Sequence, residues 1–518
     1  MSDTSAGIKI PLADSPAGVS PVLYPSEPPS APPPIAPPAP APEPVATSVT
    51  PQETIVIPVS GENPFIPNVG GTPSITPPPI PTGGPSLLKR LLMILIFIFF
   101  LGALGFVGWY AWNLTQGEKN ITLTYWGLWE NENIIAPVIA DFESTHPKTK
   151  IVYIKQSQKQ YRERLSAAIA RGDGPDIFRF HNTWVPMLVN ELSKVPVDVM
   201  TPSVFSQAFY PVVVNDLVAG SAIYGIPIEI DGLGLYYNED LFSSAGVTPP
   251  QTWEDVLNLV PKLTVKDGAH ITTSAIALGT TNNVEHYSDI IATMMMQNGT
   301  NLTEPAGQPA EEALIFYRKF ADRNDPVYTW NESLDNSVQA FASGRVAMML
   351  APSWRAFDVK ELQSGLRFKI IPIPQLPGNT VTWASYWVEG VSGKSKNQAQ
   401  AWEFVKFLTS SQSVQKLYTQ AGSVRLFGEP YARVELGSSL KDDPYVGAYI
   451  SQAPTAKSFP LASATFDNGI NDRMIKYLED AVNAMKDGSA PSGALATVAS
   501  GFTQVLTSYG LVTSAPAN

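Results

Sequence analysis

The uncharged run Leu91–Trp112 places the strongest constraint on how this chain folds, because its 22 residues contain no charged side chain. As a helix, such a run would be roughly 33 Å long, about the thickness of the hydrocarbon core of a bilayer. A cleaved signal peptide fits poorly, because a long segment precedes the run and no small-residue cleavage pattern follows it. A soluble helix would normally carry a polar face. We therefore predict that residues 87–113 form a single membrane-spanning anchor.

The residues at the two ends of this run predict its orientation. Lys89 and Arg90 precede it, and basic residues beside a spanning helix favour the cytoplasmic side. Trp109, Tyr110 and Trp112 lie at the other end, where aromatic rings would meet the interface between lipid and water. We expect a single-pass protein of the cell membrane, with a cytoplasmic amino terminus and an extracellular body.

Residues 1–86 have the composition of a disordered segment. They hold half of the 48 prolines of the chain, with one basic and six acidic residues. Such a segment cannot bury enough apolar surface to offset the entropy lost on folding. We predict a disordered proline-rich spacer with polyproline-like stiffness in places.

The 406 residues after Trp112 are enough for two lobes with separate cores. The chain has no cysteine, which excludes disulfides and thiolate metal sites, and its four histidines are scattered. Motifs of nucleotide-binding loops, zinc proteases and serine hydrolases are missing from the sequence. The net charge of −12 argues against a nucleic-acid partner, because no basic stripe is present to neutralise phosphates. We expect no cofactor and no metal.

Strand and helix patterns alternate in the first part of this body. Apolar residues recur at every second position in the strands and at helical spacing between them. This β-α-β-α-β order predicts a largely parallel sheet covered by helices. The expected strands are Ile121–Tyr125, Ile151–Ile154 and Asp176–Phe180, and the expected helices are Asn131–Thr145 and Tyr161–Ala170.

Aromatic and amide side chains follow two of these strands. Trp126 and Trp129 come after the first strand, and Asn182 and Trp184 come after the third. Ligands of such sheets bind beyond the carboxyl ends of the strands, where these residues would converge. His181 lies beside them and is interpreted as a structural neighbour of the site.

The stretch Gly225–Val256 carries the most functional information. Three isoleucines alternate as in a strand that runs into Asp231, and Gly232 then allows close backbone packing. A carboxylate between apolar runs is costly to bury without a partner. Asp231 therefore either caps a local turn or contacts a ligand at a hinge. Thr252 and Asp255 have the spacing of a capping box for the next helix.

A longer pattern surrounds Asp231. It comprises Tyr224, Gly225, Pro227, Asp231, Tyr237, Asn238, Leu241 and Phe242, followed by Ala245-Gly246 and Pro249–Trp253. This pattern resembles the hinge region of the extracellular solute-binding proteins of family 1, which include maltodextrin- and other sugar-binding receptors of ABC importers. The resemblance extends over about residues 119–430, through the runs Gly172–Ile177, Phe341–Met348 and Trp383–Trp387.

The resemblance implies a fold class, namely a two-lobed α/β fold of the periplasmic-binding-protein type (type II). It places chain crossings near residues 229–232, 350–353 and 390–394. The assignment that follows gives the first lobe residues 114–230 and 352–392, the second lobe residues 231–351 and 393–510, and a tail residues 511–518. Two regions depart from the family pattern, Gln297–Gly299 and the residues after Gly422, and no pocket contact is carried over there.

The same resemblance implies a sugar-binding cleft between the lobes. A sugar ring has an apolar C–H face and a rim of hydroxyls, which aromatic planes and charged or amide groups hold. Strand alternation allows only one of Tyr386 and Trp387 to face the cleft, and we choose Tyr386. Core packing is the competing interpretation for every ring. The candidate planes are Trp126, Trp129, Trp184, Trp354, Trp383 and Tyr386, and the candidate rim partners are Glu130, Asn182, Asp231 and Arg355.

These observations favour a membrane-anchored receptor that captures a carbohydrate for an ABC-type permease by closing two lobes, without catalysis. Two other hypotheses stay open at this level. The same fold could bind a peptide, polyamine or oxyanion, or act as a sensor. Paired carboxylates could also serve a glycan-active surface enzyme, which sequence spacing alone does not exclude.

Overall fold

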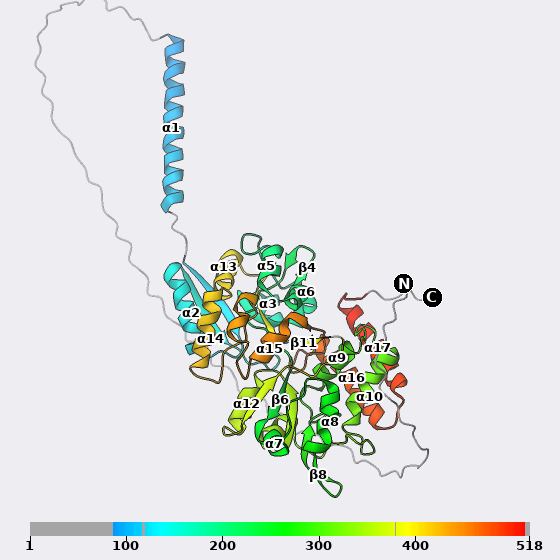
Figure 1. Ribbon diagram of the computed structural model, residues 1–518. Coiled ribbons are helices and arrows are strands. Elements are labelled where there is room, and N and C mark those ends of the chain that lie inside the picture. The colour runs from blue at the N-terminus through cyan, green and yellow to red at the C-terminus, as the bar shows by residue number, and fades with distance from the viewer. Residues whose placement is uncertain (1–85, 116–119, 379, 513–518) are drawn as a thin grey trace, which may run out of the picture. The chain divides into compact units, whose positions relative to one another are not determined.

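The computed structural model describes residues 86–115, 120–378 and 380–512 (Figure 1). Contacts divide the chain into two units, residues 1–115 and 116–518. The predicted disordered segment 1–86 and the tail 511–518 lie outside the described residues, except for residues 86, 511 and 512.

The described part of the first unit is one helix, α1 (Leu87–Thr115), of 29 residues. Its segment Leu87–Trp109 is long and apolar enough to cross a membrane, and none of it is buried against other parts of the protein. Large apolar side chains therefore remain exposed along this segment, including Phe99 and Leu104. Among the described residues, nothing covers these apolar side chains.

The second unit contains a first sheet of four strands in the order β12-β3-β1-β2. β1 (Ile121–Gly127) pairs in parallel with β2 (Thr149–Lys155) and β3 (Ile177–His181), as the sequence predicted. β12 (Trp387–Val391) returns from far along the chain and pairs with β3 in the antiparallel direction. The helices α2 (Glu132–Thr145) and α3 (Tyr161–Arg171) connect the parallel strands, again as predicted.

A second sheet has five strands in the order β10-β6-β9-β8-β7. Its parallel pair joins β8 to β9, and the other pairings are antiparallel. The predicted strand at Leu235–Tyr237 lies within this sheet. The strand bounds are Gly234–Asn238 for β6, Val265–Asp267 for β7, His270–Ile276 for β8, Val346–Ala351 for β9 and Phe368–Ile371 for β10.

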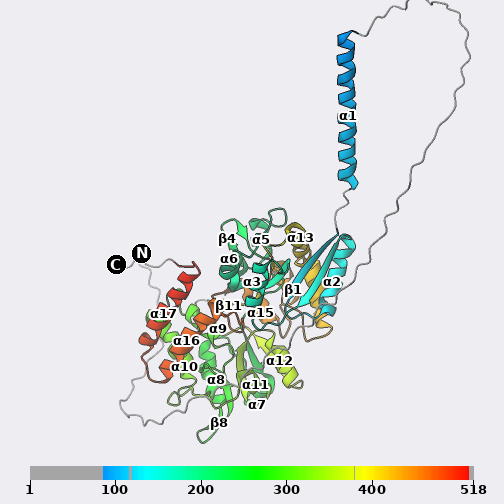
Figure 2. The same ribbon diagram turned by 180° about the vertical axis from the view of Figure 1, so that it is seen from behind.

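Helices cover both sheets, and each sheet with its helices is called a lobe here (Figures 1 and 2). The first lobe also contains α4 (Val185–Leu188), α5 (Pro202–Ala208), α6 (Pro211–Leu217), α13 (Gln398–Leu408) and α14 (Ser411–Gly422). The second lobe contains α7 (Glu239–Ala245), α8 (Trp253–Leu263), α9 (Tyr287–Gln297), α10 (Gly307–Lys319), α11 (Ser337–Ala342), α12 (Arg355–Leu362), α15 (Gly447–Gln452) and the neighbouring helices α16 (Ile470–Lys486) and α17 (Pro491–Ser508).

Short elements complete the second unit. The predicted capping box of α8 is present, because Thr252 and Asp255 exchange hydrogen bonds with each other's backbone. The expected strand before Asp231 instead forms single bridges, such as that between Ile226 and Glu389, because the chain is leaving one sheet for the other. The short elements are η1 (Asn182–Trp184), η2 (Val434–Ser439), η3 (Ala453–Thr455), β4 (Val218–Ala219), β5 (Ala222–Ile223), β11 (Thr382–Trp383) and β13 (Ala456–Lys457).

The sheet pairings correct the sequence-based lobe boundaries in two places. β10 pairs with β6, so this part of the segment 352–392 belongs to the second lobe. Its Phe368 ring stacks on Tyr236 at 5.7 Å, which fixes it in the second core. The helices α13 and α14, assigned to the second lobe, pack on the first lobe, where the ring of Phe404 lies 5.0 Å from that of Phe142. In both cases, aromatic packing between segments distant in sequence determines the lobe to which the segment belongs.

A buried ion cluster fixes three segments of the first lobe. Arg179 on β3 is 1% exposed, and its Nη1 donates to both carboxylate oxygens of Glu130 at 2.7 Å. Its Nε donates to Glu389 on β12 at 2.8 Å. Burial opposes the charge on Arg179, but the carboxylates of Glu130 and Glu389 outweigh it and raise the pKa of Arg179 well above its usual value. The guanidinium therefore stays charged inside the lobe.

Replacing Arg179 with Met should destabilise the protein by about 3–5 kcal/mol, because two buried carboxylates would lose their cation. Urea unfolding followed by tryptophan fluorescence measures this change. The control is Arg171→Met, whose partner Asp173 is also exposed, and there we expect a change below about 0.5 kcal/mol. An unchanged unfolding midpoint for Arg179→Met would contradict the proposed role of the cluster.

Candidate functional site

A cavity of about 180 Å³ lies where the two lobes meet the segments that cross between them. Both lobes and the crossing segments contribute to its wall. The lining residues are Trp129, Gln158, His181, Glu229, Asp231, Asp289, Pro352, Trp354, Phe357, Ser385, Trp387, Arg425, Glu429 and Ser463–Thr465.

Three indole rings and the phenyl ring of Phe357 provide the aromatic part of the wall. Trp129 follows β1, and Trp387 begins β12 directly opposite His181 at the end of β3. Because β12 is antiparallel, its first residue lies at the carboxyl edge of the parallel strands. The rings of Trp129 and Trp387 meet edge to face at 4.9 Å. The third ring, Trp354, is 36% exposed and approaches from the second lobe.

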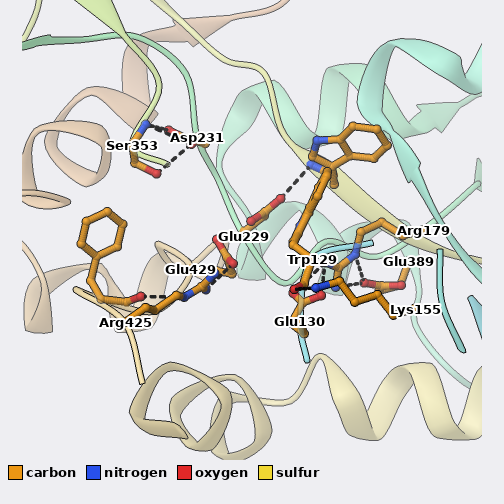
Figure 3. A network of polar contacts seen from close by, with 12 residues as sticks. Trp129, Glu130, Lys155, Arg179, Glu229, Asp231, Ser353, Glu389, Arg425 and Glu429 are labelled. Carbon is orange, nitrogen blue, oxygen red and sulfur yellow. Dashed lines mark hydrogen bonds and ion pairs between the residues drawn. The ribbon is translucent and has the colours of Figure 1, made fainter. Parts of the chain in front are cut away.

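Asp231 joins two crossing segments at the cavity wall (Figure 3). It accepts hydrogen bonds from the backbone N–H of Gly232 at 2.8 Å and from the hydroxyl of Ser353 at 2.8 Å. Burial nevertheless raises the pKa of Asp231 to about 7. Gly232 is required beside it, because a Cβ there would lie 1.8 Å from the carbonyl oxygen of Trp383.

Glu229 and Glu429 form a second polar group in the wall (Figure 3). The two side chains lie close enough to shift each other's pKa. Burial and the charge of Glu429 raise the pKa of Glu229 well above its usual value. Burial opposes ionisation of Glu429 as well, but the adjacent Arg425 lowers its pKa overall. Glu429 pairs with Arg425, and Glu229 accepts a hydrogen bond from the backbone N–H of Trp387 at 3.2 Å.

His181 lines the cavity as a neutral ring. Burial lowers its pKa to about 3. Its Nδ1 lies 2.8 Å from the hydroxyl of Thr183, and its Nε2 lies 3.1 Å from the hydroxyl of Ser385. Across the cavity, Gln158 donates to the carbonyl oxygen of Ala464 at 3.0 Å, so both ends of this contact belong to the wall.

The structure brings three of the predicted site residues to the cavity, namely Trp129, Asp231 and Trp354. It corrects the choice of Tyr386, which is fully buried and donates its hydroxyl proton to Asp216 at 2.8 Å. Its neighbour Trp387 faces the cavity instead, as alternation along a strand requires.

Four other predicted residues of the first lobe lie outside the cavity lining. Trp126 is half-buried on β1. Glu130 is held by Arg179, as described above. Asn182 donates to Asp216 at 2.8 Å. Trp184 is fully buried, and its ring meets that of Trp387 at 5.1 Å, so it supports a ring of the wall from behind.

The remaining two predicted residues, Trp383 and Arg355, lie behind the residues that line the cavity. Trp383 is buried, and its indole N–H donates to Asp289 at 2.8 Å. Arg355 stacks on the Trp354 ring at 4.2 Å and pairs with Glu285 at 2.6 Å. Both residues therefore orient groups that line the cavity rather than lining it themselves.

Sequence reasoning missed several lining residues. Glu229 and Asp289 left a usable signal, since each is a carboxylate next to large apolar residues in a buried segment. Arg425 and Glu429 have four-residue spacing but lie in a region that departs from the family pattern. No sequence pattern indicated that Ser463–Thr465 would line the cavity. Among the described residues, no group of His, Asp or Glu could hold a metal ion.

Known proteins similar to this chain bind solutes. The family model of the bacterial extracellular solute-binding protein matches residues 129–415, more than half of the chain. A multiple sugar-binding protein of Streptococcus mutans is 24% identical, with 59% of this chain and 75% of that protein covered. A maltotriose-binding protein of Pyrococcus abyssi is 20% identical, with 69% and 78% covered.

Solved structures share the fold. The sugar-binding protein MalE of Xanthomonas citri superposes with a TM-score of 0.61 at 19% identity, covering 75% of this chain and 98% of that one. This likeness identifies the two-lobed architecture that the hinge motif predicted. Together with the family match, it leads to one conclusion: the chain belongs to the family of bacterial extracellular solute-binding proteins.

Proposed function

We propose that this protein is a membrane-anchored receptor that captures a carbohydrate and delivers it to an ABC-type importer. The observation that supports this most directly is the cavity between the lobes, with three indole rings and several carboxyl groups in one wall. Indole rings pack against the C–H face of a sugar, and carboxylates accept hydrogen bonds from its hydroxyls.

The relatives support a carbohydrate ligand. One is a multiple sugar-binding protein and another is a maltotriose-binding protein. Maltooligosaccharide-binding lipoproteins of ABC transporters in Streptococcus pneumoniae are also similar, at 24% identity. We infer the importer partner from these proteins, because an ABC solute-binding protein functions by presenting its ligand to a permease.

Closure of two lobes is the mechanism that we infer. Ser353 and Asp231 lie on different crossing segments and bond to each other, which makes the hinge a connected unit. Trp129 and Trp387 belong to the first lobe, and Trp354 to the second. A ligand between these rings completes its contacts only in the closed form, and so raises the closed population by its differential affinity.

The helix α1 is the proposed anchor. Tethering beside the permease raises the local concentration of the receptor without adding contacts. Lys89 and Arg90 at its amino end favour a cytoplasmic amino terminus. The body with the cavity then faces the outside.

We infer no catalytic role. The family and its structural neighbours are binding proteins. Asp231 accepts hydrogen bonds from its own hinge, and Glu429 is paired with Arg425. These two carboxyl groups therefore take part in holding the wall.

The proposed ligand class is tested by titrating the full chain, kept in a detergent without a sugar head group, with panels of mono- and oligosaccharides, peptides, polyamines and oxyanions. We expect saturable heat release and a tryptophan fluorescence change with at least one carbohydrate, because three tryptophans line the cavity. Binding of a non-carbohydrate alone would replace this proposal with another ligand class. Product formation from a bound oligosaccharide would favour the glycan-active enzyme.

Trp354→Ala should weaken binding of that carbohydrate about tenfold, which corresponds to about 1.4 kcal/mol. The ring is 36% exposed, so its removal leaves the core intact. Calorimetry gives the affinity, and circular dichroism reports folding. Leu362→Ala, at the far end of α12 and 56% exposed, is the control and should bind normally. Equal affinity of the two variants would remove Trp354 from the site.

Replacing Ile96 and Leu101 with Arg should release the chain from membranes, because each Arg costs about 2.5–3.5 kcal/mol at a helix centre. Carbonate extraction of the membrane fraction measures the release. The control variant carries Val at both positions and should stay with the membranes. An Arg variant that resists extraction would show that α1 is not the anchor, and protease treatment of intact cells tests on which side the body lies.

A further inference from the structure

The charged groups of the cavity wall are unequal in number. Four carboxyl groups line it, those of Glu229, Asp231, Asp289 and Glu429, against one guanidinium, that of Arg425. Within the described residues, Arg425 pairs with Glu429. This pair accounts for one of the four carboxyls and for the guanidinium, and burial with the charge of Glu429 raises the pKa of Glu229, which favours its neutral form.

The other arginines near the cavity are already matched. Arg179 lies between two carboxylates of the first lobe, as shown above. Arg355 pairs with Glu285 at 2.6 Å and with Asp358 at 2.7 Å. The imidazole of His286 touches Arg355, and burial and that charge lower its pKa well below the usual value. His181 is neutral as well, so neither histidine supplies a positive charge.

Asp231 and Asp289 therefore face the cavity with neutral partners only, among the described residues. Asp231 is 8% exposed and accepts from Gly232 and Ser353. Asp289 is 2% exposed and accepts from the indole of Trp383 at 2.8 Å and from the backbone N–H of Ser463 at 3.1 Å.

Among the described residues, neither Asp231 nor Asp289 has a cationic side chain as a partner. Burial raises the pKa of Asp231 to about 7 and that of Asp289 to about 6, in each case against the hydrogen bonds that stabilise the ion. A positive charge placed beside them would restore the ionised form and gain from both. A neutral sugar would use the same oxygens as acceptors but would leave their charge without a counterion.

The aromatic part of the wall fits the same ligand. An ammonium group is attracted to the face of an indole ring, most strongly when both are removed from water. Arg355 already occupies one side of Trp354 at 4.2 Å, whereas Trp129 and Trp387 have no cation on their faces among the described contacts.

We propose that the ligand of this cavity is a saccharide that carries a protonated amine, such as an amino sugar, and that its ammonium group pairs with Asp231 or Asp289. This inference rests on the proposed function, because it adds a charge to a ligand whose ring the indoles hold. It assigns the two aspartates a part in specificity: they distinguish an amine from a hydroxyl at one position of the ring.

Matched pairs of sugars test the proposal on the full chain in the same detergent. Glucosamine is compared with glucose, and galactosamine with galactose. The third pair is the deacetylated chitin disaccharide, which carries amines, and its neutral N,N′-diacetylated form. All titrations are made at pH 6.5. N-acetylglucosamine serves as the neutral control for size. We expect the amine of at least one pair to bind at least tenfold more tightly than its neutral counterpart in calorimetric titrations.

Asp231→Asn removes the charge and keeps the shape of the side chain. Its amide oxygen can still accept from Gly232, and its amide N–H can donate to the hydroxyl of Ser353. We expect the preference for the amine to fall below threefold, because the amide carries no charge that could pair with the ammonium group. Asp289→Asn is the second variant and should have the same effect. Asp267→Asn, an exposed position on β7, is the matched control and should keep the full preference.

The possible outcomes separate the two proposals. Neutral sugars that bind as tightly as their amines, or an unchanged preference in both cavity variants that fold, would overturn this inference alone. Binding of no carbohydrate of any kind would overturn the proposed function, and this inference with it. A preference lost in Asp231→Asn but kept in Asp267→Asn supports both.

Discussion

The buried pairing of Arg179 with Glu130 and Glu389 is the interaction on which the ligand cavity depends. Two of the three segments that it joins carry an indole ring of the cavity wall, and the third, β3, ends at His181, which also lines the cavity. Trp129 precedes Glu130, and Trp387 lies two residues before Glu389 on the same side of β12. The buried ion cluster behind the cavity wall thus fixes the positions of the Trp129 and Trp387 rings. A buried pair of this kind is weak evidence for stability, but here it specifies register between segments distant in sequence.

The aromatic rings and the carboxyl groups of the cavity wall come from different parts of the fold. The rings come from strand ends and from the start of a helix, which are rigid and packed from behind by residues such as Trp184. The carboxyls of Glu229, Asp231 and Glu429 come from segments that cross between the lobes, where the backbone lacks continuous strand pairing. In the proposed closing mechanism, a ligand that contacts both kinds would link the fixed parts of the lobes to the segments that cross between them.

Local sequence patterns predicted the elements of the first lobe, because β1, α2, β2, α3 and β3 each bury a periodic set of apolar residues. The end of the first strand and the resemblance to the solute-binding family pointed to Trp129, Asp231 and Trp354, which line the cavity. The errors came from pairings between distant segments. Nothing in the sequence near Phe368 indicates that its strand joins the second sheet. Tyr386 and Trp387 differ only in which side of one strand they face, and a hydrogen bond to Asp216, more than a hundred residues earlier, decides it.

The position of β12 has a consequence for how the protein is made. The second sheet is complete once Ile371 has been synthesised, whereas the first sheet gains its last strand only at Val391. Until then the amino-terminal strands have an open edge, and Arg179 lacks one of its two carboxylates. The sheet whose strands leave the ribosome first is therefore the one that is completed last. A chain that ended between β10 and β12 would therefore hold all five strands of the second sheet but only three of the four strands of the first.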